Sequence, residues 1–578
     1  MTVSAPTSSA RAVAWEPESL KRELAAWSGI GPDPLATRHV ARRAAWDLFT
    51  PQLSDAEIEA LRDYLFPALP QRPGDAPVVV HNLIDGVWQD PGKRAAMPAL
   101  FDRRVTLADI PDSQAADVEA VLSAAYDFWS GLSWADEVLT YRKWVVANVS
   151  RILDHFSEEV MAQIRHVIPK TRLEAQKDFW EAKRAADHIG GNADRAMTGD
   201  WLPGQVPGHH YWRNPCLPAG ISVLITPMNF IYGIPMIQLV GAYLSGSPLV
   251  FKGHPYGAIC NRTMARMFMA AGADPRAFHT LEGFGKGVGN LAADHRVAVV
   301  SLTGGEATAR ALSAQRGLRT LRFEGGGCNW SWIDAGYTDA ELEAIGTRLA
   351  YSKLGFSSHK CTTLHGIAAD PTTLTKVIGY VNAEMDRWEV RDPRGTLDSR
   401  IVGPNMVHKA VTVDRIQAAA EAAGLKVLRR GGKVSGDDYA DHAEVIRPVI
   451  LETRPDSVVT CDWDDKGDVT FNLATTEFFM PILCAMEMGS FEDFLRFSLL
   501  TNPHDLACSI WSRDDRKLQR ARRILGGMLK ENDGTDSALE WEEFGASGIG
   551  DSGNMGVGEA QATLANFSRR QKGRHVTF

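Results

Sequence analysis

The fold class is decided by ISVLITPMNFIYGIPMIQLVGAYLSGSPLVF, residues 221–251. The stretch is apolar and long enough to span a bilayer, but three prolines and two polar residues interrupt it: Pro227, Asn229, Pro235, Gln238 and Pro248. These breaks favour two buried strands flanking an apolar helix over a membrane-spanning helix. Buried strands that alternate with helices indicate a parallel sheet covered on both faces.

The same alternation continues along the chain from residue 200 to residue 325. We expect strands at 221–227, 248–254, 277–283, 297–304 and 320–326. Helix-like segments lie at 233–246, 261–272 and 289–296. In such sheets, ligands bind at the carboxyl ends of the strands.

Residues 330–540 repeat this α/β character, with expected strands at 363–368, 445–451, 478–488 and 506–512. Residues 1–75 are mostly amphipathic helix, including 41–49 and the run 54–69, where Ser54 and Glu57 form a plausible capping box. RPGDAP, 72–77, is expected to be a loop between this extension and the main body. The last residues, 567–578, alternate like a strand, and a terminal strand is an unpaired edge unless another chain covers it.

Composition is that of an ordinary globular protein. The 578 residues carry a formal net charge of -9, and the mild acidity argues against a nucleic-acid binder. Seven scattered cysteines favour free thiols in a reducing compartment over a disulfide framework. The N-terminus has no apolar signal region, so we expect a cytoplasmic protein that does not enter the membrane.

Single motifs leave their chemistry open. Cys361, in SSHKCTT, is either a small buried side chain or a nucleophile whose neighbours His359 and Lys360 favour the thiolate. Glu324, in FEGGG, is either a surface residue at a strand end or a general base beside a close-approach turn. LTGG, 302–305, is a simple strand-to-helix turn or a phosphate-binding turn. GFGKGVG, 283–289, has the wrong spacing for a dinucleotide fingerprint.

Together and in order, TPMNF (226–230), VFKGHP (250–255), LTGG, FEGGG (323–327) and HKC (359–361) resemble the aldehyde dehydrogenase superfamily. TEFFMP (476–481) and NPHDLACSIWSRD (502–514) are similar to two later motifs of that family. The likeness covers roughly residues 80–578. It implies an α/β fold with a Rossmann-like cofactor domain, an α/β catalytic domain and a β oligomerisation flap.

The resemblance implies an NAD(P)-dependent oxidation of an aldehyde to a carboxylic acid. Cys361 would be the nucleophile, Asn229 would form the oxyanion hole with the Cys361 backbone N–H, and Glu324 would activate water. The resemblance implies no metal. Cofactor-binding residues would be Lys252 at the adenosine ribose, Thr303, Gly304 and Gly305 at the pyrophosphate, Glu477 and Phe479 at the nicotinamide ribose, and Pro227.

Several positions depart from the family pattern. The usual acidic residue three positions after Lys252 is Pro255, which removes a barrier to NADP, so the cofactor is NADP or NAD. Ser358-His359 stands before the cysteine region, with His359 either tuning the thiolate or substituting in packing and hydrogen bonding. Met480 stands where the family has glycine, and the segment 544–553 is two residues longer than usual. The K-x-H-P sequence (252–255), the 75-residue extension and the long C-terminal glycine segment resemble the phenylacetate-degradation (PaaN-like) branch and semialdehyde dehydrogenases of aromatic catabolism. HKCT (359–362) also resembles pyrroline-5-carboxylate dehydrogenases.

The expected domains are a helical extension (1–75), an NAD(P)-binding domain (76–326) with an oligomerisation hairpin near 204–217, a catalytic domain (327–545), and a C-terminal segment with an oligomerisation strand (546–578). The resemblance implies a homodimer or dimer of dimers. Two alternatives stay open: a CoA-acylating enzyme, which passes the thioester to coenzyme A, and a catalytically silent scaffold of the same fold.

Overall fold

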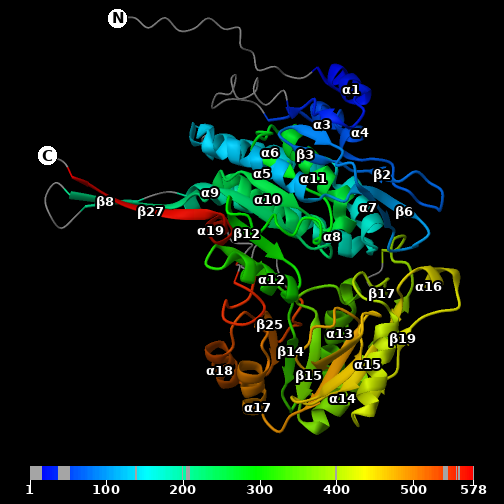
Figure 1. The fold of residues 1–578 in the computed structure, drawn as a ribbon. Coiled ribbons are helices and arrows are strands. Elements are labelled where there is room, and N and C mark those ends of the chain that lie inside the picture. Colours follow the sequence, from blue (N-terminus) through cyan, green and yellow to red (C-terminus); the bar gives the residue numbers. More distant parts are fainter. Residues whose placement is uncertain are drawn as a thin grey trace, which may run out of the picture.

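A computed structural model describes residues 16–36, 52–136, 139–197, 200–203, 209–397, 400–537, 544–554, 556 and 560–576. The chain forms two lobes, which meet below strand β12 (Figure 1). We call them the upper and lower lobes as Figure 1 draws them. Each lobe is built around a mainly parallel sheet.

The upper lobe contains a five-stranded parallel sheet in the order β11-β10-β9-β12-β13. Its strands are β9 (Ile221–Ile225), β10 (Leu249–Lys252), β11 (Phe278–Thr280), β12 (Val297–Thr303) and β13 (Leu321–Glu324). All five sequence-predicted strands of this region are confirmed. Side chains alternate between two cores, because Val223 and Val250 pack with helix α5 (Ala115–Ser130) whereas Leu224 and Phe251 face the opposite helical layer.

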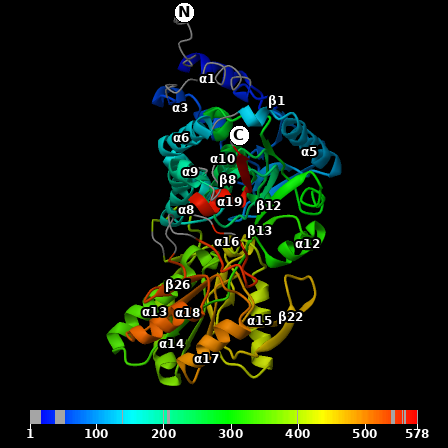
Figure 2. The same cartoon turned by 90° about the vertical axis from the view of Figure 1, so that its left-hand side faces the viewer.

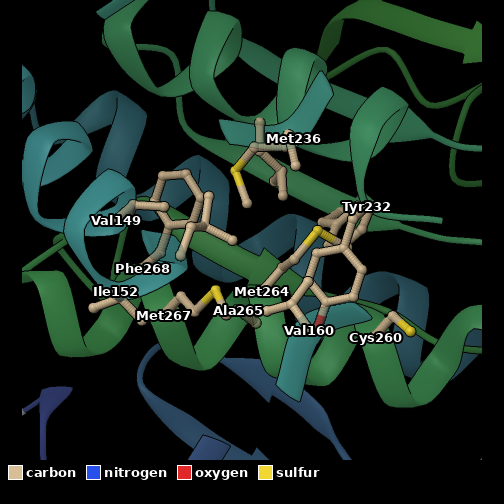
Figure 3. Close-up of a cluster of buried hydrophobic side chains, with 14 of the residues drawn as sticks. Val149, Ile152, Val160, Tyr232, Met236, Cys260, Met264, Ala265, Met267 and Phe268 are labelled. Carbon is tan, nitrogen blue, oxygen red and sulfur yellow. The ribbon is translucent and has the colours of Figure 1, made fainter. Parts of the chain in front are cut away.

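That opposite layer is made of α6 (Leu139–His155), α7 (Ser157–Val167), α8 (Arg172–Arg184), α10 (Gly233–Ser245) and α11 (Ala258–Ala271). Figure 3 shows how side chains from several of these helices meet in one apolar cluster, among them Val149, Met236 and Phe268. The apolar helix predicted inside residues 221–251 is therefore α10, a buried helix of a globular core. None of the helices among the described residues is both long and apolar enough to cross a bilayer.

The helix expected at 289–296 is wrong, because these residues form turns. Two arginines that follow in the chain explain the difference. Arg316 donates to the Ala292 carbonyl, and Arg319 donates to the carbonyls of Ala293 at 2.7 Å and Asp294 at 2.6 Å. These bonds satisfy the carbonyls of residues 292–294 from outside the segment and hold it as a compact turn between β11 and β12.

The lower lobe holds a seven-stranded sheet in the order β18-β21-β24-β15-β14-β25-β26. The strands are β14 (Asn329–Ile333), β15 (Leu364–Ala369), β18 (Val427–Arg429), β21 (Val449–Glu452), β24 (Ile482–Glu487), β25 (Ala507–Trp511) and β26 (Met528–Glu531). The strands predicted at 363–368, 445–451, 478–488 and 506–512 correspond to β15, β21, β24 and β25. Covering helices include α13 (Asp339–Leu354), α14 (Pro371–Met385) and α15 (Val411–Ala422).

The N-terminal extension packs on the upper lobe, on the side away from the lower lobe (Figures 1 and 2). It contains α1 (Pro17–Ala26), α3 (Asp55–Glu59) and α4 (Arg62–Leu65), and the capping box of Ser54 and Glu57 is confirmed. Buried Asp33 accepts hydrogen bonds from Trp88 at 2.6 Å and Tyr64 at 2.7 Å. The helix predicted at 41–49 lies outside the described residues.

A three-stranded sheet, ordered β27-β8-β7, projects sideways from the upper lobe (Figure 1). It joins β7 (Asp200–Pro203) and β8 (His209–Pro218) to the C-terminal strand β27 (Ser568–Val576). Residues 204–208 of the expected hairpin lie outside the described residues. Just before β27, helix α19 (Ala560–Asn566) packs against α9 (Gly190–Met197) and α10, so the chain returns to the upper lobe at its end.

Candidate active site

The candidate site lies where the carboxyl ends of the upper sheet face the lower lobe. Asn229 follows β9, Thr303 ends β12 and Glu324 ends β13. Cys361 comes from the lower lobe, just before β15. Strands β12 and β13 pair in parallel with Thr303 opposite Glu324. The topology thus gathers residues that are more than 100 positions apart in the chain.

The nucleophile segment begins with an unusual backbone turn. Phe356, Ser357 and Ser358 have φ angles of 56°, 53° and 66°, in the left-handed region that costs a non-glycine residue about 1–2 kcal/mol. The Ser357 hydroxyl accepts a hydrogen bond from the Gly403 N–H at 2.7 Å, and the Ser358 hydroxyl donates to a carbonyl of α13 at 2.7 Å. These bonds hold the strained turn that leads into Cys361.

His359 is a packing and hydrogen-bonding residue in this structure. Its Nε2 accepts from the Met406 N–H at 3.2 Å, which leaves Nδ1 to donate to the Phe356 carbonyl at 3.1 Å. Burial lowers the pKa of His359 to about 3, so the ring is neutral at ordinary pH. Of the two interpretations left open by the sequence, these contacts favour packing over tuning of the thiolate.

Asn229 lies beside the nucleophile segment. Its side-chain amide donates to the His359 carbonyl at 3.0 Å, and the residue is buried. The backbone of Cys361 is fixed from the other side, because Asn329 donates to the Cys361 carbonyl at 2.7 Å. The side chain of Asn229 is therefore held against the same short stretch of backbone that carries Cys361.

Glu324 is buried, and neither carboxylate oxygen has a hydrogen-bond partner among the described residues. Its backbone carbonyl accepts from the Gly304 N–H at 3.0 Å, which fixes the position of the residue at the end of β13. Burial, with a smaller contribution from the Glu181 carboxylate, holds the pKa of Glu324 well above its usual range. A desolvated carboxyl without partners can accept a proton or orient water.

Cys361 is partly exposed, whereas the other six cysteines are buried, and all seven are free thiols. Burial of its sulfur, followed by the carboxylates of Glu324 and Glu477, raises the pKa of the Cys361 thiol well above its usual range. The ammonium of Lys360 opposes this shift but is directed to the Asp536 carbonyl at 2.7 Å. The resting sulfur is therefore a thiol, which must lose its proton to become nucleophilic.

A glycine allows Glu477 to approach the backbone next to Glu324. A Cβ placed on Gly326 would lie 1.9 Å from a Glu477 carboxylate oxygen, and the Gly327 N–H donates to Glu477 at 3.3 Å. Burial raises the pKa of Glu477 to about 7. Phe479, two residues on, has a φ of 49°, and its ring centroid lies 5.5 Å from that of His359. The structure therefore brings together the segments that carry Asn229, Glu324, Cys361 and Glu477.

The remaining predicted residues lie along the sheet edge of the upper lobe. Pro227 follows β9, and Lys252 is the last residue of β10. Thr303 accepts from Gln238 at 2.9 Å, and the other side-chain atom of Gln238, its buried Oε1, has no partner in the described structure. Gly304 and Gly305 lead into α12 (Glu306–Arg316), whose N-terminus receives no side-chain cap. Uncapped N–H groups at a helix start suit a phosphate.

Three residues that the sequence analysis missed hold the site together, and we call them the α8 cluster: Glu174 and Asp178 in α8, and Lys170, two residues before that helix begins. Asp178 accepts from the backbone N–H groups of 231, 232 and 233 at 3.0, 3.1 and 2.8 Å, just after Asn229. Glu174 accepts from the Phe356 N–H at 2.6 Å. The motif Thr171–Glu174 fits a capping box and could have indicated the start of this helix, but not its distant contacts.

Lys170 completes the α8 cluster. It is fully buried, pairs with Asp178 at 3.0 Å, and lies 4.6 Å from the ring centroid of Phe230 and 5.2 Å from that of Phe356. These two rings stack on each other at 5.1 Å and belong to the Asn229 and Cys361 segments. The α8 cluster therefore fixes both the Asn229 segment and the Cys361 segment.

The arrangement suits covalent chemistry at a carbonyl carbon. It offers a thiol, an amide donor beside it, and a carboxyl that is free to exchange protons. Among the described residues, no three His, Cys, Asp or Glu side chains gather as a metal site.

Comparisons with known proteins agree with this geometry. The model of the aldehyde dehydrogenase family matches residues 96–572. A sulfoacetaldehyde dehydrogenase of Neptuniibacter caesariensis is 24% identical over 424 residues, which cover 71% of this chain and 86% of that protein. An NADP-dependent glyceraldehyde-3-phosphate dehydrogenase of Streptococcus equinus is 23% identical over 72% of this chain and 82% of its own length.

Solved structures share the fold. A methylmalonate-semialdehyde dehydrogenase from Oceanimonas doudoroffii superposes with a TM-score of 0.76 at 17% identity, covering 86% of this chain and 98% of that one. An NADP-dependent enzyme of E. coli gives a TM-score of 0.75 at 18% identity, covering 86% of this chain and 98% of its own.

Proposed function

The chain belongs to the aldehyde dehydrogenase family, oxidoreductases that act on aldehydes with NAD or NADP, and we propose that it oxidises its aldehyde hydrolytically, through a cysteine thioester. The observation that carries the proposal is Glu324, whose buried carboxyl has no hydrogen-bond partner among the described residues and interacts electrostatically with Cys361. A carboxyl so placed can deliver water to a thioester on Cys361.

The residues of the upper sheet edge fit a dinucleotide. The uncapped start of α12, the partnerless Oε1 of Gln238 and the glycine that admits Glu477 are the supporting observations. We propose that Lys252 and Pro227 bind the adenosine half, Thr303, Gly304 and Gly305 the pyrophosphate, and Glu477 and Phe479 the nicotinamide ribose. Nicotinamide supplies the hydride acceptor. Residues 76–326 would thus form the cofactor domain and 327–545 the catalytic domain.

Cys361 begins the reaction. Its thiol proton passes to solvent, and the sulfur adds to the aldehyde carbon to form a thiohemiacetal. Asn229 and the Cys361 backbone N–H donate to the oxygen that becomes negative. Removing one such donor costs about 2.7–4 kcal/mol in other enzymes.

After oxidation, Cys361 carries a thioester. Glu324 then removes a proton from water, which attacks the thioester carbon and releases the carboxylic acid and the free thiol. A CoA-acylating enzyme needs no such base, so the buried carboxyl favours water as the acceptor.

Substrate and assembly are further parts of the proposal. The sequence likeness to the phenylacetate-degradation branch and to semialdehyde dehydrogenases supports an aromatic or semialdehyde substrate. We also propose that the protein acts in the cytoplasm.

Strand β27 is the edge of the projecting sheet, and an edge strand offers unpaired N–H and C=O groups to a second copy. A homodimer or dimer of dimers is therefore proposed, which sedimentation at micromolar concentration tests, since a monomer would contradict it.

The central experiment follows absorbance of the reduced nicotinamide with aliphatic, aromatic and semialdehyde substrates, with NAD or NADP, with and without coenzyme A. Cys361→Ala should abolish the signal, whereas Cys461→Ala, in the hairpin strand β22 (Val458–Asp462), should retain it. Signal that depends on coenzyme A would replace the hydrolytic proposal with the acylating one. Absence of signal in a folded protein that binds cofactor would favour a silent scaffold.

Glu324→Gln separates the two halves of the reaction. The variant should release about one equivalent of reduced cofactor per active site and then stall as the thioester. Mass spectrometry of the intact protein would detect the acyl adduct on Cys361. Steady turnover at the wild-type rate would contradict the role of Glu324.

A further inference from the structure

A cavity of about 470 Å³ lies at the amino edge of the lower sheet, where β25 begins. Its walls come from the helical turn Phe497–Thr501, the loop 502–505, the end of α18 (Asp515–Ile524) and the segment 547–550. None of the residues proposed above for catalysis or cofactor binding is among the described residues that line it. Ligand pockets typically measure about 300–1,000 Å³, so this cavity can hold a small molecule of its own.

The rim of the cavity is aliphatic. Leu499, Leu500 and Ile549 line it and are 58%, 76% and 94% exposed. Ile524 and Leu525 add further aliphatic surface at the end of α18. A ligand with an apolar body would remove this surface from water, which is favourable in proportion to the area covered.

The interior of the cavity has polar atoms that lack partners. The Ser498 hydroxyl oxygen, the His504 Nδ1 and the Asp505 Oδ1 are buried and have no hydrogen-bond partner in the part of the chain that the structure describes. All three residues line the cavity. Buried polar atoms are nearly always paired in folded proteins, so three at one cavity indicate a polar group that occupies it.

The polar interior is anionic. Asp505 carries the only charge among the described lining residues, because burial lowers the pKa of His504 and leaves its ring neutral. Its Oδ2 accepts from the N–H groups of Ser547 and Gly550 at 3.0 and 3.3 Å, and from the Ser547 hydroxyl. These bonds leave Oδ1 for a further donor. A positively charged donor such as an ammonium group therefore fits the interior.

One wall of the cavity belongs to the segment 544–553, the glycine segment that is longer than the family pattern. Beyond the cavity, this segment reaches the end of β13. The Gly325 N–H donates to the Ser552 carbonyl at 2.8 Å, and the Ser552 hydroxyl donates to the Gly326 carbonyl at 2.8 Å. A ligand against Ser547 and Gly550 would therefore contact the segment that supports the strand end of Glu324.

We propose that this cavity is a second ligand site, which takes a small primary ammonium ion with an aliphatic or aromatic body. A primary ammonium has three N–H donors, which is enough for Asp505, His504 and Ser498 together. Its apolar body covers Leu500 and Ile549 at the rim. The site is independent of the proposed function, because binding there needs neither aldehyde nor cofactor.

The test is isothermal titration calorimetry of the full chain with hexylammonium chloride, hexan-1-ol and hexanoate, each without aldehyde or cofactor. The three probes share one apolar body and differ in the charge of the head group. Hexylammonium should bind at least about tenfold more tightly than the other two, a difference of about 1.4 kcal/mol. Hydrogen exchange should slow in 497–505 and 544–554 when hexylammonium is bound, which locates the site.

Variants test the head group and the rim separately. Asp505→Asn should weaken hexylammonium binding by about tenfold or more. Asp370→Asn should leave it unchanged, because that carboxylate accepts from two backbone N–H groups at the start of α14, outside the cavity walls. Leu500→Lys places a like charge at the rim and should also weaken binding. Leu397→Lys is its control, since Leu397 is 70% exposed elsewhere in the lower lobe.

Three results would overturn the inference. Equal affinity for the three probes would remove the role of the carboxylate. Absence of binding at millimolar concentration would mean that the cavity holds water alone. Unchanged affinity in both Asp505→Asn and Leu500→Lys would place the bound probe elsewhere. If Asp505→Asn does not fold, Leu500→Lys and the comparison of the three probes still decide.

Discussion

Replacing Asp178 by asparagine should destabilise the protein far more than the loss of one charge on the surface. The substitution leaves the Lys170 ammonium fully buried without its partner, whereas the pair is now 1% and 0% exposed with an N···O distance of 3.0 Å. Removing one member of a buried pair costs about 3–5 kcal/mol. The backbone N–H groups of 231–233 would also lose the carboxylate that accepts from them.

A double-mutant cycle measures this effect. Lys170→Met and Asp178→Asn are made singly and together, and the free energy of unfolding is obtained from urea titrations followed by tryptophan fluorescence. The double variant should be more stable than the sum of the single losses predicts, because it buries no unpaired charge. The Lys376–Asp339 pair, with an N···O distance of 2.8 Å but 50% and 67% exposed, is the matched control, and its removal should cost at most about 1 kcal/mol.

The same variants report on catalysis. Asp178 anchors the segment that carries Asn229, and the α8 cluster also holds the Cys361 segment through Glu174. Any folded Asp178→Asn protein should therefore lose kcat while the Kd for cofactor changes little. The reasoning would be refuted if the free energy of unfolding of Asp178→Asn lay within about 0.5 kcal/mol of the wild-type value. It would also be refuted if the stability losses of the two single variants added up to that of the double variant.

Three further predictions follow from contacts in the site. Gly326→Ala should weaken NAD binding by about tenfold or more in titration calorimetry, because its Cβ would lie 1.9 Å from the Glu477 carboxylate; unchanged affinity would contradict the close approach. Glu324→Gln should lose turnover yet melt at a higher temperature. Burial raises the pKa of Glu324 well above 4.5, so its charge destabilises the folded state increasingly as pH rises from 4.5 to the pKa in the folded protein. The melting temperature of Glu324→Gln should therefore exceed that of wild type by more at pH 8 than at pH 5. An equal increase at both pH values would contradict the raised pKa. Glu174→Gln removes one of the two carboxylate oxygens that accept from buried N–H groups, which should cost about 1–3 kcal/mol of stability. It should also lower kcat, because Glu174 holds the Phe356 segment. A stable variant with wild-type kcat would exclude this positioning role.

Strands β9, β10 and β12 of the upper sheet were predictable because their side chains are mostly apolar. Strand β14 was missed, since NWSWI mixes polar and aromatic residues, although every one of its residues is buried. The expected helix at 289–296 is a turn, held by hydrogen bonds to its carbonyls from arginines about 25 residues later. Local pattern cannot reveal such tertiary partners.

The residues of the candidate site also divide into those that the sequence could indicate and those that it could not. Cys361, Glu324 and Asn229 stand in motifs that sequence resemblance could assign to roles. Asp178 stands in no such motif, and its importance comes from partners that only the folded chain brings near, the N–H groups after Asn229. Residues that act through other residues are therefore the ones that sequence reasoning overlooked.

The pairing of β8 with β27 sets the order in which this protein can be completed on the ribosome. About 350 residues separate the two strands, which pair antiparallel over most of their length. At about 5–20 residues per second, translation takes roughly 20–70 s to supply the missing partner. During that time the whole lower lobe emerges and can fold, while one edge of β8 has no partner within the chain. Until β27 has been synthesised, the nascent protein therefore carries β8 with an unpaired edge that other chains could pair with.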